Sequence, residues 1–268
     1  MIKSVYPDPA TALPLESVAL PGASEMPSRE VEHRGTSEIV LAVDLSTLVA
    51  LAQRHDGMIE FVPQVGDFVA AGEPLFVLHD GAIAVDDSAV QSSVAFGPER
   101  TLEQDPMFAF RIIVDIALKA LSPAINDPTT AVLALDQVHR LLRMVGQRKL
   151  RGEVIVDESG RPRLIFRTPN WEHYVQVACS EIRASGAGNL QVARRMRAML
   201  ENLRRTLPEH RHATLDTELD LLDSAIQIHF TRSEELALAR IPDSQGLGGS
   251  MRSATAIADH KTAVDPHR

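Results

Sequence analysis

The stretch RTLEQDPMFAFRIIVDIALKALSPAINDPTTAVLALDQV, residues Arg100–Val138, decides the fold class. It contains two Asp-Pro pairs, at 105–106 and 127–128. Aspartate is a favoured helix N-cap and proline is favoured at the first helical position, so each pair predicts a helix start. The first helix is expected to end near Leu121 and the second near Val145, before a glycine. The short SPAIN linker predicts that these helices are neighbours, in an antiparallel or angled pair.

Downstream of this stretch, the pattern changes to strand and then back to helix. The segments at 154–156 and 164–166 flank DESGRPR and predict a β-hairpin. Apolar spacing then predicts three further helices, at about 170–185, 190–206 and 213–240. Residues 100–240 are therefore expected to form a helical subdomain of about five helices with one β-hairpin.

Upstream, the pattern is typical of β-structure. In VGDFVAAGEPLFVL, Val65–Leu78, Gly-Asp and Ala-Gly turn signals separate short apolar segments. The pattern is similar to the biotinyl and lipoyl carrier type of β-fold, a small barrel or sandwich with tight turns. Such carriers present a lysine for modification, but residues 36–99 contain none, which excludes a swinging-arm carrier. Strands are also expected at 37–43 and 58–62, with a helix at 45–55 between them.

The predicted fold class is therefore α+β, with a small β-rich subdomain at 36–99 followed by the helical subdomain at 100–240. Residues 1–35 are rich in proline and small polar residues and lack apolar periodicity. Residues 241–268 are similar in this respect. Both segments are predicted to be disordered, as a lead and a tail.

Composition and charge exclude several classes of protein. The chain has 268 residues, with 27 basic and 36 acidic side chains and a formal net charge of −9 at pH 7. Residues 1–99 hold 4 basic and 15 acidic residues, whereas residues 100–240 hold 20 and 18, which supports a boundary near residue 100. This balance lacks the basic footprint of general nucleic-acid binding.

The cysteine count and the apolar runs of the sequence predict neither a disulfide nor a targeting or membrane segment. The single cysteine, Cys179, excludes an intramolecular disulfide. No apolar run reaches the roughly 20 residues that span a bilayer, and no signal-peptide core is present. We therefore expect a soluble, cytoplasmic chain that is peripheral to the inner membrane at most.

The same Arg100–Val138 stretch resembles a bacterial family of predicted membrane proteins, domain of unknown function 2254. The pairing of RTLEQDP with ALSPAINDPTTA carries the resemblance, which extends from about Val40 through RTPNWEHYVQVACSEIRASGA to the helices after it. It implies a soluble domain that follows a multi-helix membrane region in other members, and this chain is expected to lack that region. Members tend to carry arginine where Lys119 stands, and lysine lacks the bidentate geometry of arginine. The resemblance implies no activity.

Polar residues around the two helix starts form the candidate site. Two neighbouring helix N-termini bind an anion through free backbone N–H groups and the helix dipole, and Arg100 would supply a countercharge. Alternatively, Asp105 and Asp127 occupy those N–H groups themselves as caps and repel a second anion. The candidate ligand-binding or anion-binding residues are Arg100, Asp105, Asp115, Asn126, Asp127 and Thr130.

Two groups of charges need separate interpretation. Asp115 lies four residues after Arg111 and four before Lys119, so the three share one helix face. Such a carboxylate suits acid–base chemistry or ion coordination, but we favour a charge ladder that supports the helix, or a subunit contact. Arginines cluster at 194–205, and we expect them to pair with acidic residues within the chain or across subunits rather than with lipid headgroups.

The sequence contains no GxSxG, P-loop, HExxH or CxxC spacing, and its tail glycines lack GxGxxG spacing. No catalytic residue, metal ligand or cofactor is therefore assigned. We expect a non-enzymatic module that forms a homo-oligomer or docks on a membrane-embedded partner. The competing hypothesis is an enzyme or a small-ligand or anion sensor with a pocket at the two helix starts.

Overall fold

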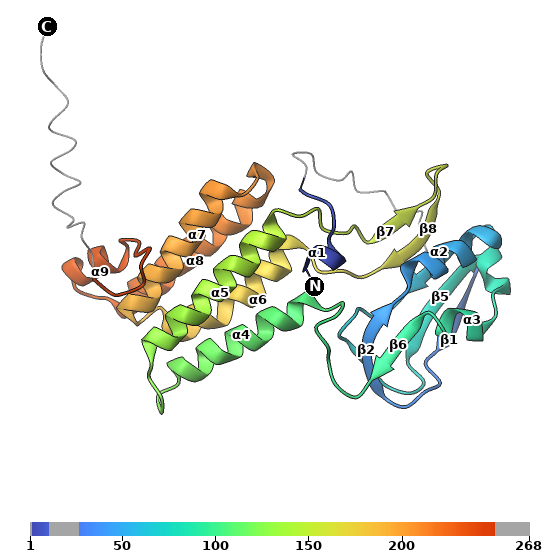
Figure 1. The fold of residues 1–268 in the computed structure, drawn as a ribbon, viewed down its shortest axis with the longest axis horizontal. Helices are drawn as coiled ribbons and strands as arrows, with labels where there is room; N and C mark the ends of the chain where they lie inside the picture. The colour runs from blue at the N-terminus through green and yellow to red at the C-terminus, as the bar shows by residue number, and fades with distance from the viewer. Residues whose placement is uncertain (1, 11–26, 250–268) are drawn as a thin grey trace, which may run out of the picture. The chain divides into compact units, whose positions relative to one another are not determined.

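The computed structural model describes residues 2–10 and 27–249, and its fold mixes helices and sheets as predicted (Figure 1). The chain divides into two compact units, each of which is built from two stretches of sequence. Unit 1 comprises residues 1–109 and 149–170, and unit 2 comprises residues 110–148 and 171–268.

Unit 1 is built around two β-sheets. A five-stranded sheet has the order β1-β5-β3-β8-β7, and a three-stranded sheet has the order β4-β2-β6. Neighbouring strands are antiparallel except for β3 and β8. The elements of this unit are α1 (Ile2–Val5), β1 (Ser28–Glu32), β2 (Glu38–Val43), α2 (Leu45–Arg54), β3 (Gly57–Phe61), β4 (Phe68–Val69), β5 (Pro74–Asp80), a 3-10 helix (Gly81–Ala84), α3 (Asp87–Gln91), β6 (Val94–Gly97), β7 (Val154–Val156) and β8 (Pro162–Phe166).

Local sequence explains the turns and the helix start of this unit. Gly66 and Gly72 have φ of +95° and +85°, which favours glycine, and they flank the short β4. Asp44 caps α2, because its side chain accepts hydrogen bonds from the backbone N–H groups of Ser46 and Thr47. The apolar sides of the strands and of α2 then form one core, in which the rings of Phe61 and Phe76 lie 5.4 Å apart.

The hairpin β7–β8 forms where the sequence predicted it, but it belongs to unit 1 rather than to the helices around it in sequence (Figure 1). The reason is long-range pairing, because β8 runs parallel to β3 with Leu164 opposite Ile59. The buried Arg163 strengthens this pairing, since its Nη1 donates to the carbonyl of Gly57 at 3.1 Å. A boundary at residue 100 alone therefore describes the chain incompletely.

Unit 2 is helical. One predicted helix, at 213–240, is in fact two, because the backbone at Phe230 is extended (φ −108°, ψ 103°) and ends α8. Residues 110 onward of α4 belong to this unit. The helices are α4 (Pro106–Leu121), α5 (Pro128–Gly146), α6 (Trp171–Gly186), α7 (Leu190–Thr206), a 3-10 turn (Glu209–Arg211), α8 (His212–His229) and α9 (Ser233–Ala239).

Ordered structure also occurs inside the predicted lead and tail. Strand β1 lies within the lead and pairs with β5. In the tail, Asp243 is buried, and its backbone N–H donates to the carbonyl of Arg194 on α7 at 3.1 Å. The parts of the lead and tail at 11–26 and 250–268 lie outside the described residues.

Candidate functional site

The first helix start is closed by its own side chains. Asp105 caps α4, because its Oδ1 accepts the backbone N–H of Phe108 at 3.0 Å. Its Oδ2 lies 3.2 Å from Nη1 of Arg100. The carboxyl group is buried, and burial raises its pKa above the ordinary aspartate value. This helix N-terminus is therefore already occupied by a carboxylate of the chain.

The RTLEQDP loop packs on the carrier-like turn within unit 1. A Cβ atom on Gly66 would lie 2.6 Å from Oδ2 of Asp105, so any other residue here would force Asp105 to shift. In the same loop, Oε1 of Gln104 accepts the backbone N–H of Val43 at 3.3 Å. These contacts place the RTLEQDP loop against the VGDFVAAGEPL turn and against β2.

A cavity of about 1250 Å³ opens beside this contact, and all of its lining residues belong to unit 1. Its volume exceeds the few hundred to about 1,000 Å³ of typical small-molecule sites. Of the predicted site residues, only Asp105 lines it, together with its neighbours Glu103 and Gln104. The rest of the lining comes from α1, β2, α2, the end of β3 and the loop after it, the segment before and within β6, Pro106, and the open end of the β7–β8 hairpin.

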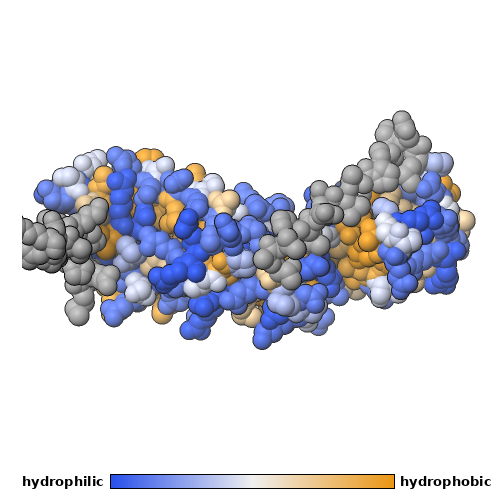
Figure 2. Space-filling model, turned by 90° about the horizontal axis from the view of Figure 1, so that it is seen from above, coloured by the Kyte–Doolittle hydropathy of each residue, from blue (hydrophilic) through white to orange (hydrophobic). Residues whose placement is uncertain are grey.

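One wall of this cavity consists of hydrophobic residues at the edge of the core of unit 1, which stay partly exposed. Seven partly buried hydrophobic residues pack against the core of unit 1, and five of them line the cavity: Leu45, Val49, Val65, Val94 and Ile155. In Figure 2, hydrophobic residues gather on the face of unit 1 seen there, at the right of the picture. An apolar surface left open in this way is typical of a binding site.

The polar groups of the lining differ in how well they are satisfied. The carboxylate of Asp44 accepts hydrogen bonds from the hydroxyl groups of Ser46 and Thr47 and from their backbone N–H groups, which lowers its pKa to about 2. By contrast, Arg151 and Arg167 are exposed, and neither has an acidic partner within ion-pair distance among the described residues. Sequence reasoning missed both arginines, although Arg167 is the first residue of the RTPNWEHYV stretch that carries part of the family resemblance.

The second helix start is likewise capped from within. Asp127 accepts the backbone N–H of Thr130 at 3.1 Å and also its hydroxyl group, which lowers the pKa of Asp127. Asn126 precedes it with φ of +47° and an exposed side chain. Arg100 and Asp105 come before the first residue of α4. Asn126, Asp127 and Thr130 come after its last residue. Because a helix of 16 residues is about 24 Å long, these two groups lie at opposite ends of α4.

Asp115 lies between these two groups and forms a surface ion pair. Nε of Arg111 donates to Oδ1 of Asp115 at 2.8 Å, and Nη1 of Arg111 lies 2.5 Å from Glu181 on α6. The Asp115 side chain is 61% exposed. The Arg111–Asp115 half of the expected charge ladder forms, whereas Lys119 has no ion pair among the described residues.

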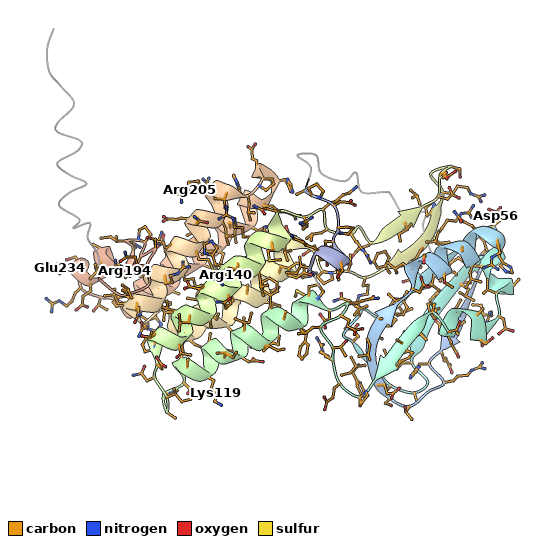
Figure 3. All side chains as sticks on the ribbon, in the orientation of Figure 1. Asp56, Lys119, Arg140, Arg194, Arg205 and Glu234 are labelled. Carbon is orange, nitrogen blue, oxygen red and sulfur yellow. The ribbon has the colours of Figure 1, made fainter. Side chains whose placement is uncertain are left out.

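The arginine cluster of α7 is used mainly inside unit 2. Arg195, Arg197 and Arg204 form ion pairs with Asp136, Asp223 and Asp216 respectively. Arg194, which Figure 3 labels far along α7 from Arg205, is buried and donates to backbone carbonyl groups at 241 and 248. Arg205 is exposed and has no ion pair within the described part of the chain. These contacts correspond to the internal charge pairing that we expected.

Other chemistry-bearing groups do not form a site. Cys179 is fully buried in α6, and burial raises the pKa of its thiol well above the ordinary value. Within residues 2–10 and 27–249, no three His, Cys, Asp or Glu side chains are grouped so as to hold a metal ion. The cavity of unit 1 is therefore the candidate site.

A family model described as "Predicted membrane protein (DUF2254)" matches residues 11–202, which is most of the chain. The chain belongs to this family. Uncharacterized proteins of Mycobacterium bovis and Mycobacterium tuberculosis are each 28% identical to it over 274 residues. These alignments cover 99% of this DUF2254 chain and 50% of each relative, so the chain spans about half the length of the curated relatives it matches. No solved structure matches it.

The family description refers to a membrane, but no membrane-spanning helix is found among the described residues. In that part of the chain, no helix combines the length and the apolar character that crossing a membrane requires. The names of the family and of these relatives state no activity.

Proposed function

We propose that unit 1 is a non-enzymatic binding module for a small ligand, and that the cavity beside the RTLEQDP loop is its binding site. The cavity itself carries the proposal, because it combines an opened hydrophobic core with unpaired polar groups. Apolar contact with the core would supply affinity for a ligand, and the few polar groups would fix its orientation. A sensor of this kind requires no catalytic residues.

Thermal-shift measurements on the full chain test this proposal. A ligand that binds only the folded state raises the melting temperature. We expect at least one member of a panel of nucleotides, sugars, phosphates, metal ions and fatty acids to do so. Ala50→Trp places a large side chain into the cavity from α2 and should abolish the shift.

A matched control is Ala84→Trp, at an exposed position that does not line the cavity, and this variant should keep the shift. If no ligand stabilises the wild-type chain, or if Ala50→Trp keeps the full shift, the cavity is not a binding site and the proposal fails.

A second candidate function is self-assembly, which the outward face of α4 favours. Ile112 and Ile116 lie one turn apart there and are 39% and 48% exposed. Asp115 and Lys119 are exposed on the same side of the helix. This mixed charge is self-complementary, because a two-fold contact would place Lys119 of one copy near Asp115 of the other. We therefore propose a second copy of the chain as the occupant of this face.

Light scattering tests the second candidate. The wild-type chain should be a dimer at micromolar concentration, and Ile116→Ser should shift it towards a monomer. Leu133→Ser, at an exposed residue of α5, is the control and should leave the dimer intact. A wild-type monomer at all concentrations overturns this candidate. A monomer that co-purifies with membranes would indicate a membrane-embedded partner instead of a second copy.

A further inference from the structure

Arg151 and Arg167 form no ion pair among the described residues, and neither does Arg54, which does not line the cavity. Other arginines of unit 1 form ion pairs with aspartates, as Arg29, Arg34, Arg100, Arg161 and Arg163 do. The N-terminal 99 residues of this unit hold 15 acidic residues, so potential partners are abundant in sequence. The two arginines that line the cavity are nevertheless without an acidic partner among the described residues.

Arg151 and Arg167 lie on the two chain segments at the open end of the β7–β8 hairpin. In the β7–β8 hairpin, the N–H of Phe166 donates to the carbonyl of Glu153 at 2.9 Å. Arg151 and Arg167 therefore lie just beyond the paired part of the two strands, and both line the cavity. Two guanidinium groups that emerge from adjacent backbone segments suit one shared anionic group.

The acidic residues of the lining differ in their hydrogen-bond partners. The oxygens of Asp44 accept hydrogen bonds from the first turn of α2. Those of Asp105 accept from Phe108 and Arg100. Glu103 is the acidic lining residue that has no partner among the described residues, and it is exposed. Among the described residues, the lining thus has two cations without an acidic partner, Arg151 and Arg167, and two carboxylates without a cationic one, Asp44 and Glu103.

The apolar wall adds the second requirement. Val49, Val94 and Ile155 belong to three different elements of unit 1 and all remain partly exposed to the cavity. A small inorganic anion would leave this surface in contact with water. A ligand with an apolar chain would cover it and gain roughly 25 cal/mol for each Å² of apolar surface removed from water.

We propose that the cavity binds an amphipathic anion, with its apolar chain along the wall of Val49, Val94 and Ile155 and its carboxylate or phosphate group on Arg151 and Arg167. This inference rests on the proposed function, since it names the ligand class of the same site. Carboxylate and phosphate both accept bidentate hydrogen bonds from a guanidinium group, so the two headgroups share one recognition chemistry.

Isothermal titration of the full chain with four probes tests the inference. The probes are decanoate, decyl phosphate, decanol and inorganic phosphate, each below any concentration at which it aggregates. We expect decanoate or decyl phosphate to bind at least ten times more tightly than decanol. Inorganic phosphate alone should show no binding in the same range. The stronger of the two anionic probes identifies the headgroup.

Variants then assign the headgroup contact. The double variant Arg151→Gln, Arg167→Gln should lose at least tenfold in affinity for the anionic probe and keep its affinity for decanol. Arg54→Gln is the matched control, because Arg54 is an exposed arginine of the same unit that does not line the cavity. It should bind both probes like the wild type.

The outcomes separate this inference from the proposed function. Equal binding of decanol and the anions, or full anion affinity in the double variant, overturns the inference. So does a panel ligand of another class that binds in the cavity while both anions fail to bind, although the proposed function then stands. If Ala50→Trp leaves anion binding unchanged, the anion binds elsewhere, and both the inference and its support for the proposed function fail.

Discussion

Gly66 and Asp105 approach so closely that a Cβ atom on Gly66 would lie 2.6 Å from Oδ2 of Asp105. The two residues are far apart in sequence, one in the carrier-like turn and the other at the start of α4. Asp105 is also held by Phe108 and Arg100, so it has little freedom to move away. The contact therefore couples the cap of α4 to the β-structure of unit 1.

Gly66→Ala should destabilise unit 1 by more than the backbone strain alone. The residue has φ of +95°, where a Cβ costs about 1–3 kcal/mol, and the new methyl group also clashes with Asp105. Gly72→Ala is the control, because Gly72 has φ of +85° but no atom within 4 Å of its Cβ position. In urea unfolding, Gly66→Ala should lose about 1 kcal/mol more than Gly72→Ala. Equal losses would contradict the contact.

The cap of α2 should give a defined pH dependence. Hydrogen bonds from Ser46 and Thr47 lower the pKa of Asp44 from 3.8 to about 2 in the folded chain. A carboxyl group with a lowered folded pKa stabilises the fold above its unfolded pKa, and that stabilisation is lost as the pH falls through the folded value. The contribution of Asp44 should therefore be full above pH 4 and decrease towards pH 2.

Asp44→Asn isolates this effect, because asparagine keeps the capping acceptor but does not titrate. The difference in unfolding free energy between the wild type and Asp44→Asn should shrink from pH 5 to pH 2.5, since other acidic groups affect both alike. Asp44→Ala should instead lose about 1 kcal/mol at neutral pH, as expected for a missing cap. A difference between the wild type and Asp44→Asn that does not change with pH would show that the cap bonds are absent in solution.

The sequence predicts those features that depend on neighbouring residues. The Asp-Pro pairs mark the starts of α4 and α5, because capping is decided within four residues. Gly66 and Gly72 mark the turns around β4 for the same reason. The break at Phe230 was missed, because apolar spacing continues across it and only the extended backbone there divides α8 from α9.

Long-range pairing explains what the sequence does not predict. Leu164 lies opposite Ile59 in a parallel pair, and no local pattern specifies a partner so far away in the chain. The cavity depends on this pairing, because β8 carries the hairpin end with Arg151 and Arg167 into unit 1. Of the six candidate residues, only Asp105 lines the cavity. Arg100, Asn126, Asp127 and Thr130 were chosen as sequence neighbours of two helix starts, and Asp115 was chosen for its charged helix face.

Cys179 should be unreactive in the folded chain. It is fully buried in α6, and burial raises the pKa of its thiol, so little thiolate forms and no reagent reaches it. Ellman's reagent should release no thionitrobenzoate from the native chain and one equivalent per chain in urea. A stoichiometric reaction of the native chain within minutes would mean that α6 opens readily or that the thiol is exposed.

Arg194 should hold residues 241–249 on α7. Its side chain is buried, and it donates from Nε to the carbonyl of Ile241 at 3.0 Å and from Nη1 to the carbonyl of Gly248 at 2.9 Å. Arg194→Lys replaces this planar fork by a single ammonium group, which does not reproduce both bonds, so at least one contact of the segment to α7 is lost. We therefore expect faster proteolytic cleavage within 241–249, at least fivefold, with little change in cleavage elsewhere.

Arg205→Lys is the matched control, because Arg205 is an exposed arginine of the same helix, and this variant should be cleaved within 241–249 at the wild-type rate. Equal cleavage rates for the two variants would show that Arg194 does not anchor this segment.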